Sequence, residues 1–208
     1  MRIDSLKSTP DRMGRYWVKF SNGDSLGLYK QTVQDHGLYA GKELSDAEFA
    51  ALMEAAGKMS AKMRAVRIVT ASSVSKGDLE QRLVRKGEDP KQAREAVEWM
   101  EDLHLIDDRE MAHNVVRRCI SKGYGLTRAK QALYEKRVPK QYWEEALENY
   151  PDQFETIMDF LQGRLKSKSD EKEVRRAVDA LLRRGHSWSV IRRALNQFSF
   201  DTEEFQEE

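Results

Sequence analysis

The sequence has few of the residues that form covalent cross-links and none of the long apolar runs that cross membranes. One cysteine, Cys119, stands among 208 residues, so no internal disulfide can form and a reducing compartment is expected. No stretch approaches the roughly 18 consecutive apolar residues of a membrane-spanning helix, and the N-terminus lacks an apolar segment. We therefore expect a cytoplasmic protein that does not bind membranes.

The residue types that carry most catalytic and metal chemistry are present but scattered. The four histidines lack zinc-site spacing, and we interpret them as ordinary surface or capping residues: His36, His104, His113 and His186. No phosphate-binding loop occurs, and residues 122–125 lack the preceding strand and the third glycine of a dinucleotide fingerprint. Asp107 and Asp108 are more simply a helix cap than a metal-binding pair. The sequence predicts no catalytic residue, no metal and no cofactor.

Prolines are also few, with four in the chain, and those after residue 44 separate segments rather than interrupt them. Before that point the sequence is aromatic-rich and strand-like at residues 15–20 and 25–29. The intervening residues 21–24 contain an Asn-Gly pair that tolerates the positive φ angles of a tight hairpin turn. Residues 2–6 supply a possible third strand. Further on, Ser45 and Glu48 have the spacing of a capping box at a helix start.

Three later segments repeat one apolar pattern about every fifty residues. Each has two apolar residues four apart, a turn, and then apolar residues at i, i+3, i+4 and i+7, which share one face of a helix. The downstream sets are Ala93, Ala96, Val97 and Met100; Trp143, Ala146, Leu147 and Tyr150; and Ile191, Ala194, Leu195 and Phe198. An amphipathic stretch precedes each pair, which makes three helices per unit. Chance alignment of ordinary helices is the weaker alternative.

The pattern predicts a mainly α fold of three tandem three-helix repeats, in an elongated curved arrangement, after a small N-terminal β-hairpin or three-strand element. One such unit buries too little apolar surface alone, so neighbouring units are expected to stack. The expected segments are an N-terminal extension with strands and a helix (1–58), three repeats (59–107, 108–150 and 151–200) and an acidic tail (201–208).

The turn between the last two helices of each unit has a glycine in two of the three copies. Gly87 and Gly185 suit the left-handed backbone conformation just after a helix, and Arg137 stands at the same place in the middle unit. If Arg137 keeps that conformation, it costs about 1 kcal/mol relative to glycine. A functional reason for the arginine is then worth testing.

Positive charge is concentrated in the second and third units although the net charge is only +1. Residues 109–137 contain eight basic and two acidic residues, and residues 164–193 contain ten basic and four acidic residues. Solvated helix faces remain an alternative, but recurring arginine pairs favour an anionic partner. For Tyr124 we favour packing at a helix start. The candidate binding residues are Arg117, Arg118, Lys122, Tyr124, Arg128, Lys130, Arg175, Arg176, Arg183, Arg184, Arg192 and Arg193.

Particular residues resemble the signature of the bacterial RecX regulatory family. The most specific block runs through residues 105–112 and then Ser121-Lys122-Gly123-Tyr124-Gly125 with Arg128. Residues 79–87 are similar to that family's first-repeat motif, and the N-terminal strands followed by residues 38–44 look like the extension of its longer members. Leu126 stands where the family usually has proline, and Arg137 where it usually has glycine.

The resemblance implies a modulator of the RecA recombinase. Members have tandem three-helix repeats and bind the RecA filament on DNA, where they impede filament growth, ATP hydrolysis by RecA and strand exchange, and so regulate recombination and DNA repair. We expect a monomer that binds the RecA filament and contacts single- and double-stranded DNA through phosphates. Two alternatives remain open. One is a general DNA-binding module without a filament partner. The other is an enzyme, although no set of residues in the sequence would explain catalysis.

Overall fold

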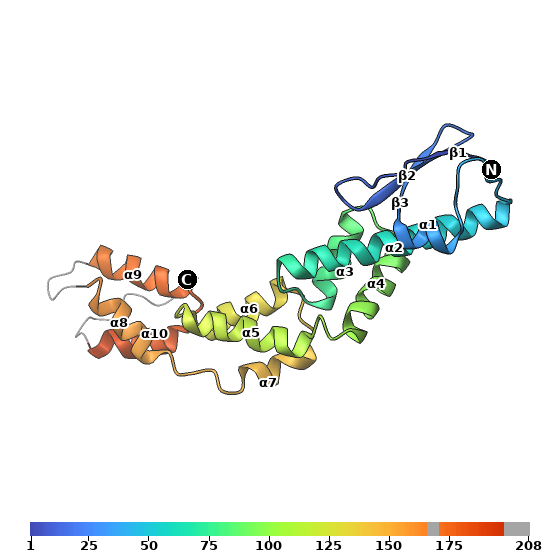
Figure 1. The fold of residues 1–208 in the computed structure, drawn as a ribbon. Coiled ribbons are helices and arrows are strands. Elements are labelled where there is room, and N and C mark those ends of the chain that lie inside the picture. Colours follow the sequence, from blue (N-terminus) through green and yellow to red (C-terminus); the bar gives the residue numbers. More distant parts are fainter. Residues whose placement is uncertain (166–170, 198–208) are drawn as a thin grey trace. The chain divides into compact units, whose positions relative to one another are not determined.

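The computed structural model describes residues 1–165 and 171–197, and it divides into two compact units, Met1–Ile106 and Asp107–Glu208. The predicted position of Phe198 and the acidic tail at 201–208 lie outside the described residues. The described part is mainly helical, with one three-stranded sheet, as predicted (Figure 1). Unit 1 contains β1 (Ile3–Leu6), β2 (Arg15–Phe20), β3 (Ser25–Tyr29), α1 (Lys30–Asp35), α2 (Asp46–Ala71), α3 (Lys76–Arg85) and α4 (Pro90–Asp102). Unit 2 contains α5 (Asp108–Ser121), α6 (Leu126–Glu135), η1 (Lys140–Tyr142), α7 (Trp143–Leu147), α8 (Phe154–Gln162), α9 (Glu171–Arg183) and α10 (Trp188–Gln197).

The three predicted strands form one antiparallel sheet in the order β1-β2-β3. Alternation along the strands turns Val18, Phe20 and Leu28 into a buried core. In the turn, only Gly23 of the Asn-Gly pair has a positive φ, +89°. The Asn22 side chain instead donates to the Asp24 carboxylate at 2.6 Å. The hairpin was therefore predicted correctly, with a turn that needs one left-handed residue.

Helix α2 begins with the predicted capping box. Ser45 Oγ accepts from the Glu48 backbone N–H at 3.2 Å, and the Ser45 N–H donates to Glu48 Oε2 at 2.8 Å. The helix then continues for 26 residues, through the predicted segment boundary at residue 58. Its first half places Leu52 in the core of the sheet, and its second half places Ala65 in the core with α3 and α4. One helix is thus shared by the N-terminal extension and the first repeat.

Each predicted repeat has its own buried cluster of apolar side chains. The first is formed by α2, α3 and α4, the second by α5, α6 and α7, and the third by α8, α9 and α10. The series from Ala93 to Met100 is buried on α4 as expected. In the middle unit, however, α7 ends at Leu147, and Tyr150 lies beyond it. The prediction that Tyr150 belongs to this helix was wrong, because a 3₁₀ turn and a five-residue helix replace the longer one.

The same stop follows the second helix of every repeat. Gly87, Arg137 and Gly185 have φ angles of +90°, +54° and +83°. The residue after each one donates its N–H to the carbonyl of the residue five positions earlier, as Val138 does to Leu133 at 3.1 Å. This is the Schellman arrangement that satisfies the last carbonyls of a helix. Arg137 thus has the left-handed geometry of the two glycines, which was the condition for its expected strain.

Candidate partner-binding surface

The candidate residues in unit 2 fall into two groups by exposure. Tyr124, Arg128 and Arg184 are half-buried. The others are exposed: Arg117, Arg118, Lys122, Lys130, Arg175, Arg176, Arg183, Arg192 and Arg193. None of the described helices is long and apolar enough to span a membrane. The exposed residues present their charges to solvent. The half-buried residues also contact other parts of the fold.

The end of α5 presents cations around a tight turn. Asp107 caps the start of this helix by accepting from the N–H groups of Arg109 and Glu110, which confirms the cap interpretation. At the other end Gly123 has a φ of +62°, and the Tyr124 N–H donates to the Cys119 carbonyl at 3.0 Å. This turn directs the chain into α6 and fixes where the cations around it lie. The exposed cations there are Arg117, Arg118 and Lys122.

Tyr124 packs against the buried cluster of the second repeat, in agreement with the packing interpretation. Its carbonyl accepts from the Tyr150 hydroxyl at 2.6 Å, and the Lys122 ammonium lies 5.9 Å from its ring centroid. Burial raises the pKa of the Tyr150 hydroxyl to about 12, so this donor keeps its proton at neutral pH. Tyr150 therefore stabilises the turn between α5 and α6 through its hydrogen bond to the Tyr124 carbonyl.

The second and third repeats meet through main chain at the start of α6. The Gly125 N–H donates to the Arg184 carbonyl at 2.9 Å, and the Thr127 N–H donates to the Gly185 carbonyl at 3.3 Å. A Cβ on Gly125 would overlap the Gly185 carbonyl, and a Cβ on Gly185 would overlap the backbone of Arg128. This contact brings two of the candidate residues, Arg128 and Arg184, to either side of the junction.

His186 completes this junction, and its interpretation as an ordinary surface or capping histidine was wrong. It is 5% exposed, and its Nε2 lies 3.1 Å from the Gly123 carbonyl oxygen. Burial lowers the pKa of its imidazole, so the ring is neutral at neutral pH and donates from Nε2. The contact joins residues 63 positions apart, and spacing along the sequence therefore gave no sign of it.

Two candidate arginines have carboxylate partners. Arg128 Nη1 lies 2.9 Å from Glu135, and Arg193 Nη2 lies 2.8 Å from Asp152. Arg193 also stacks on Phe154, with its guanidinium carbon 4.5 Å from the ring centroid. Exposed pairs of this kind contribute only about 0–1 kcal/mol, so a phosphate can displace the carboxylate at small cost. The pairs hold the two guanidinium groups in place.

Phe160 on α8 gathers two further guanidinium groups. The guanidinium carbons of Arg164 and Arg184 lie 4.5 Å and 4.9 Å from its ring centroid. Arginine ordered on an aromatic ring loses less freedom when it binds an anion. Arg164 is not among the residues predicted from the sequence, and its position four residues after Phe160, near the end of a helix, was the signal that could have found it.

The remaining exposed arginines and one lysine have no side-chain hydrogen bond or ion pair with the described residues. Arg117 is different, because it donates to the Asn114 side chain. On α9, Arg176 and Arg183 are seven residues apart and share a face. Unpaired cations on helix faces are the groups that phosphate contacts use. They are Arg118, Lys130, Arg175, Arg176, Arg183 and Arg192.

Cys119 is not part of this surface. Its side chain is 5% exposed, and burial raises the pKa of the thiol. The thiolate is therefore scarce at neutral pH, and the residue acts as a small apolar side chain of the core.

The fold and the surface together define a helical-repeat protein whose second and third repeats present exposed cations, six of which form no ion pair within residues 1–165 and 171–197. Family models described as the second and third three-helix domains of RecX match residues 107–147 and 152–195. Regulatory protein RecX of Vibrio parahaemolyticus serotype O3:K6 is 30% identical over 149 residues, which cover 70% of this chain and 94% of that protein. The chain belongs to the RecX family.

Other relatives extend the likeness to the N-terminal part. Regulatory protein RecX of Clostridioides difficile strain 630 is 23% identical over 207 residues, 96% of both chains. A crystal structure of regulatory protein RecX superposes with a TM-score of 0.63 at 19% identity, over 94% of this chain and 98% of that one. RecX from Lactobacillus salivarius gives a TM-score of 0.59 at 22% identity, over 70% and 98%. The part of the chain that the structure describes therefore has the fold of RecX proteins.

Proposed function

We propose that this chain regulates the RecA recombinase by binding the RecA filament on DNA and inhibiting filament extension, ATP hydrolysis by RecA and strand exchange. Membership of a family of regulatory proteins supports the proposal. The observation that carries it is the set of exposed cations on two repeats that form no ion pair with the described residues, together with the Gly125–Arg184 contact that joins these repeats. A filament offers protein surface beside DNA phosphates, and a basic helical surface is complementary to both.

The inhibition requires no catalytic group in this chain. A protein that binds one filament state better than another shifts the population of filaments toward that state. Loss of ATP hydrolysis by RecA then follows from changed occupancy or conformation of the filament. In this scheme the second and third repeats supply the contacts, and the protein acts in the cytoplasm as a monomer.

The direct test is ATP hydrolysis by RecA on single-stranded DNA with added protein. Regulation predicts that the rate falls as the protein is titrated, and that it falls further when RecA is assembling than after filaments are complete. A rate that is unchanged at saturating protein would refute the proposal. Bovine serum albumin at equal concentration controls for crowding.

General DNA binding without a filament partner is the second candidate, because the same unpaired arginines suit phosphates of bare DNA. Affinity for bare and for RecA-coated DNA at two salt concentrations separates the two. Filament preference that survives moderate salt supports regulation of RecA. A steep loss common to both forms of DNA supports phosphate contacts alone.

A further inference from the structure

A hollow of ≈ 410 Å³ in unit 1 is lined mainly by cations. It opens where the loop before β2 faces the second half of α2 and the end of α3. Of nine lining residues, five are basic and none is acidic: Met13, Arg15, Arg64, Arg67, Ile68, Ala71, Ser72, Arg82 and Lys86. These residues lie outside the candidate surface of unit 2, and the inference drawn from them does not depend on the proposed function.

Carboxylates behind the hollow hold three of the five cations in place. Arg15 Nη2 lies 2.8 Å from Asp11, Arg82 Nη2 lies 2.8 Å from Asp78, and Arg64 pairs with Glu88. Each guanidinium has five N–H donors, and these pairs leave some of them free. Ordering before binding lowers the entropy cost of capturing an anion.

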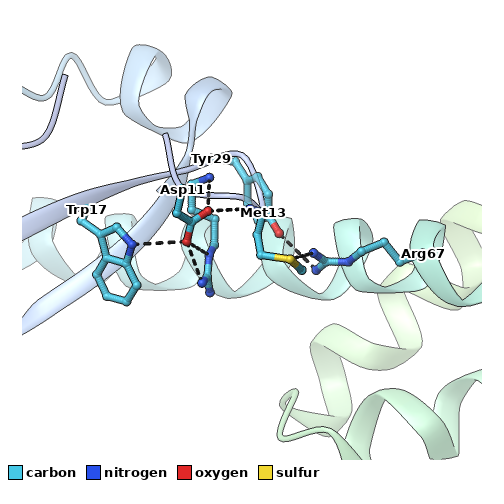
Figure 2. Close-up of polar contacts among 6 residues, drawn as sticks. Asp11, Met13, Trp17, Tyr29 and Arg67 are labelled. Atoms are coloured by element: carbon cyan, nitrogen blue, oxygen red, sulfur yellow. Dashed lines mark hydrogen bonds and ion pairs between the residues drawn. The ribbon is translucent and has the colours of Figure 1, made fainter. Parts of the chain in front are cut away.

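Asp11 fixes the position of Arg15 through several hydrogen bonds. Its carboxylate accepts from the backbone N–H groups of Arg15 and Met13, from the Arg15 guanidinium and from the Trp17 indole N–H at 3.3 Å (Figure 2). The backbone donor of Arg15, together with the other Arg15 and Met13 contacts, lowers the pKa of Asp11 to about 2. The carboxylate is therefore charged throughout the physiological range and keeps Arg15 at the rim.

Among the described residues, Arg67 is held by neutral groups. Its Nη2 donates to the Tyr29 hydroxyl at 3.2 Å, and its Nη1 lies 3.5 Å from the Met13 sulfur. Figure 2 shows the side chain reaching from α2 to these two residues of the N-terminal segment. Lys86, the C-cap of α3, is exposed and makes no ion pair with the described residues. The hollow thus has two cations without a compensating carboxylate.

We propose that this hollow binds backbone phosphate of a nucleic-acid strand. Guanidinium forks match phosphate oxygens, and the two uncompensated charges attract an anion. The lining residues include no aromatic ring on which a base could stack. The contact is therefore to phosphate, independent of base sequence, and the N-terminal strands serve to place Arg15 and to steady Arg67.

The test compares two double variants of the full chain that lose equal charge from unit 1. Arg67→Gln with Lys86→Gln removes the uncompensated cations. Arg85→Gln with Arg94→Gln is the matched control, because both residues are exposed and neither lines the hollow. The probe is a fluorescein-labelled oligothymidylate, and fluorescence anisotropy measures its affinity across a range of sodium chloride concentrations.

Loss of one phosphate contact makes the slope of log affinity against log salt shallower by about 0.7 on a single strand, so affinity then falls about threefold less between 50 and 200 mM salt. We expect weaker binding at 50 mM salt and a slope shallower by at least about 0.7 for the Arg67 and Lys86 pair, and smaller changes in both for the control. Equal losses in both pairs, or wild-type binding by the first pair, would overturn the proposal.

Two further measurements distinguish loss of the site from unfolding of the variant, and a nucleic-acid strand from a free nucleotide. Lys86→Gln alone tests the site if the double variant unfolds, since Lys86 is exposed and supports no core contact; it should lose part of the same affinity. ATP without magnesium is the second probe. If ATP binds more tightly than the oligonucleotide and loses its binding in the Arg67 and Lys86 variant, the hollow takes free nucleotides and the strand assignment is wrong.

Discussion

The backbone N–H of Gly125 donates to the carbonyl oxygen of Arg184 at 2.9 Å, and this bond joins the second and third repeats by main chain. Gly125 has a φ of −78°, which any residue can adopt, so glycine is required here by close approach and not by backbone conformation. The junction positions the cations of both repeats relative to each other.

Replacing Gly125 with alanine is expected to destabilise unit 2 by about 1–3 kcal/mol, because the new Cβ overlaps the Gly185 carbonyl and the repeats must separate. Urea denaturation followed by circular dichroism measures the change. Gly163→Ala is the matched control, since its Cβ would make only ordinary contacts, with the Asp159 carbonyl at 3.5 Å and the Phe160 carbonyl at 3.8 Å. Equal stability of the Gly125 variant and the control would show that the repeats do not pack this closely.

Arg137→Gly should raise the free energy of unfolding by about 1 kcal/mol, because a φ of +54° is strained for a residue with a Cβ. The reciprocal change, Gly87→Arg, introduces the same strain in the first repeat and should lower stability by a similar amount. Thermal melting of both variants gives the comparison. If inhibition of RecA falls as Arg137→Gly gains stability, the arginine is maintained for binding.

Reversing the charge of Arg117 and Arg118 together should weaken inhibition of RecA by tenfold or more if each contributes a charged contact of about 1 kcal/mol. Helix content should not change, because both side chains are exposed. Circular dichroism and RecA ATP hydrolysis are the two measurements. Full inhibition by this variant would remove the end of α5 from the binding surface, and Arg85→Glu with Arg94→Glu controls for net charge.

Stability of unit 2 should decrease as pH falls below about 6.5, the ordinary pKa of histidine. Burial lowers the pKa of His186 in the folded chain, so the unfolded chain takes up the proton first. The stabilisation from the neutral His186 ring is complete above the pKa of this histidine in the unfolded chain, and it is lost progressively as the pH falls below that value. Urea midpoints at about pH 8 and about pH 5.5 should differ more for the native chain than for His186→Gln. Parallel shifts in the two proteins would contradict this origin.

The positions of helices and stops could be predicted because they depend on local rules. Apolar residues at helical spacing placed Leu83, Leu133 and Leu181 in three cores, and glycine at two stops indicated the conformation of Arg137 at the third. The capping residues Ser45 and Asp107 were likewise visible from their neighbours. Such features involve residues within one helical turn of each other.

Features that depend on distant contacts were missed. The burial of His186 comes from a carbonyl 63 residues away, and Tyr150 leaves its helix to reach Tyr124. The cationic hollow of unit 1 combines residues from a loop, α2 and α3, each of which looks like an ordinary exposed side chain in the sequence. The spacing of residues along the sequence carries no information about such long-range contacts.

Helix α2 has a mechanical consequence for unit 1. Its 26 residues extend about 39 Å as one continuous rod, with Leu52 embedded among the strands and Ala65 embedded among α3 and α4. A rod without a proline or a break has no hinge. The strands and the first repeat are therefore expected to move together as one rigid body. Removal of the strands would expose the first half of α2 to water.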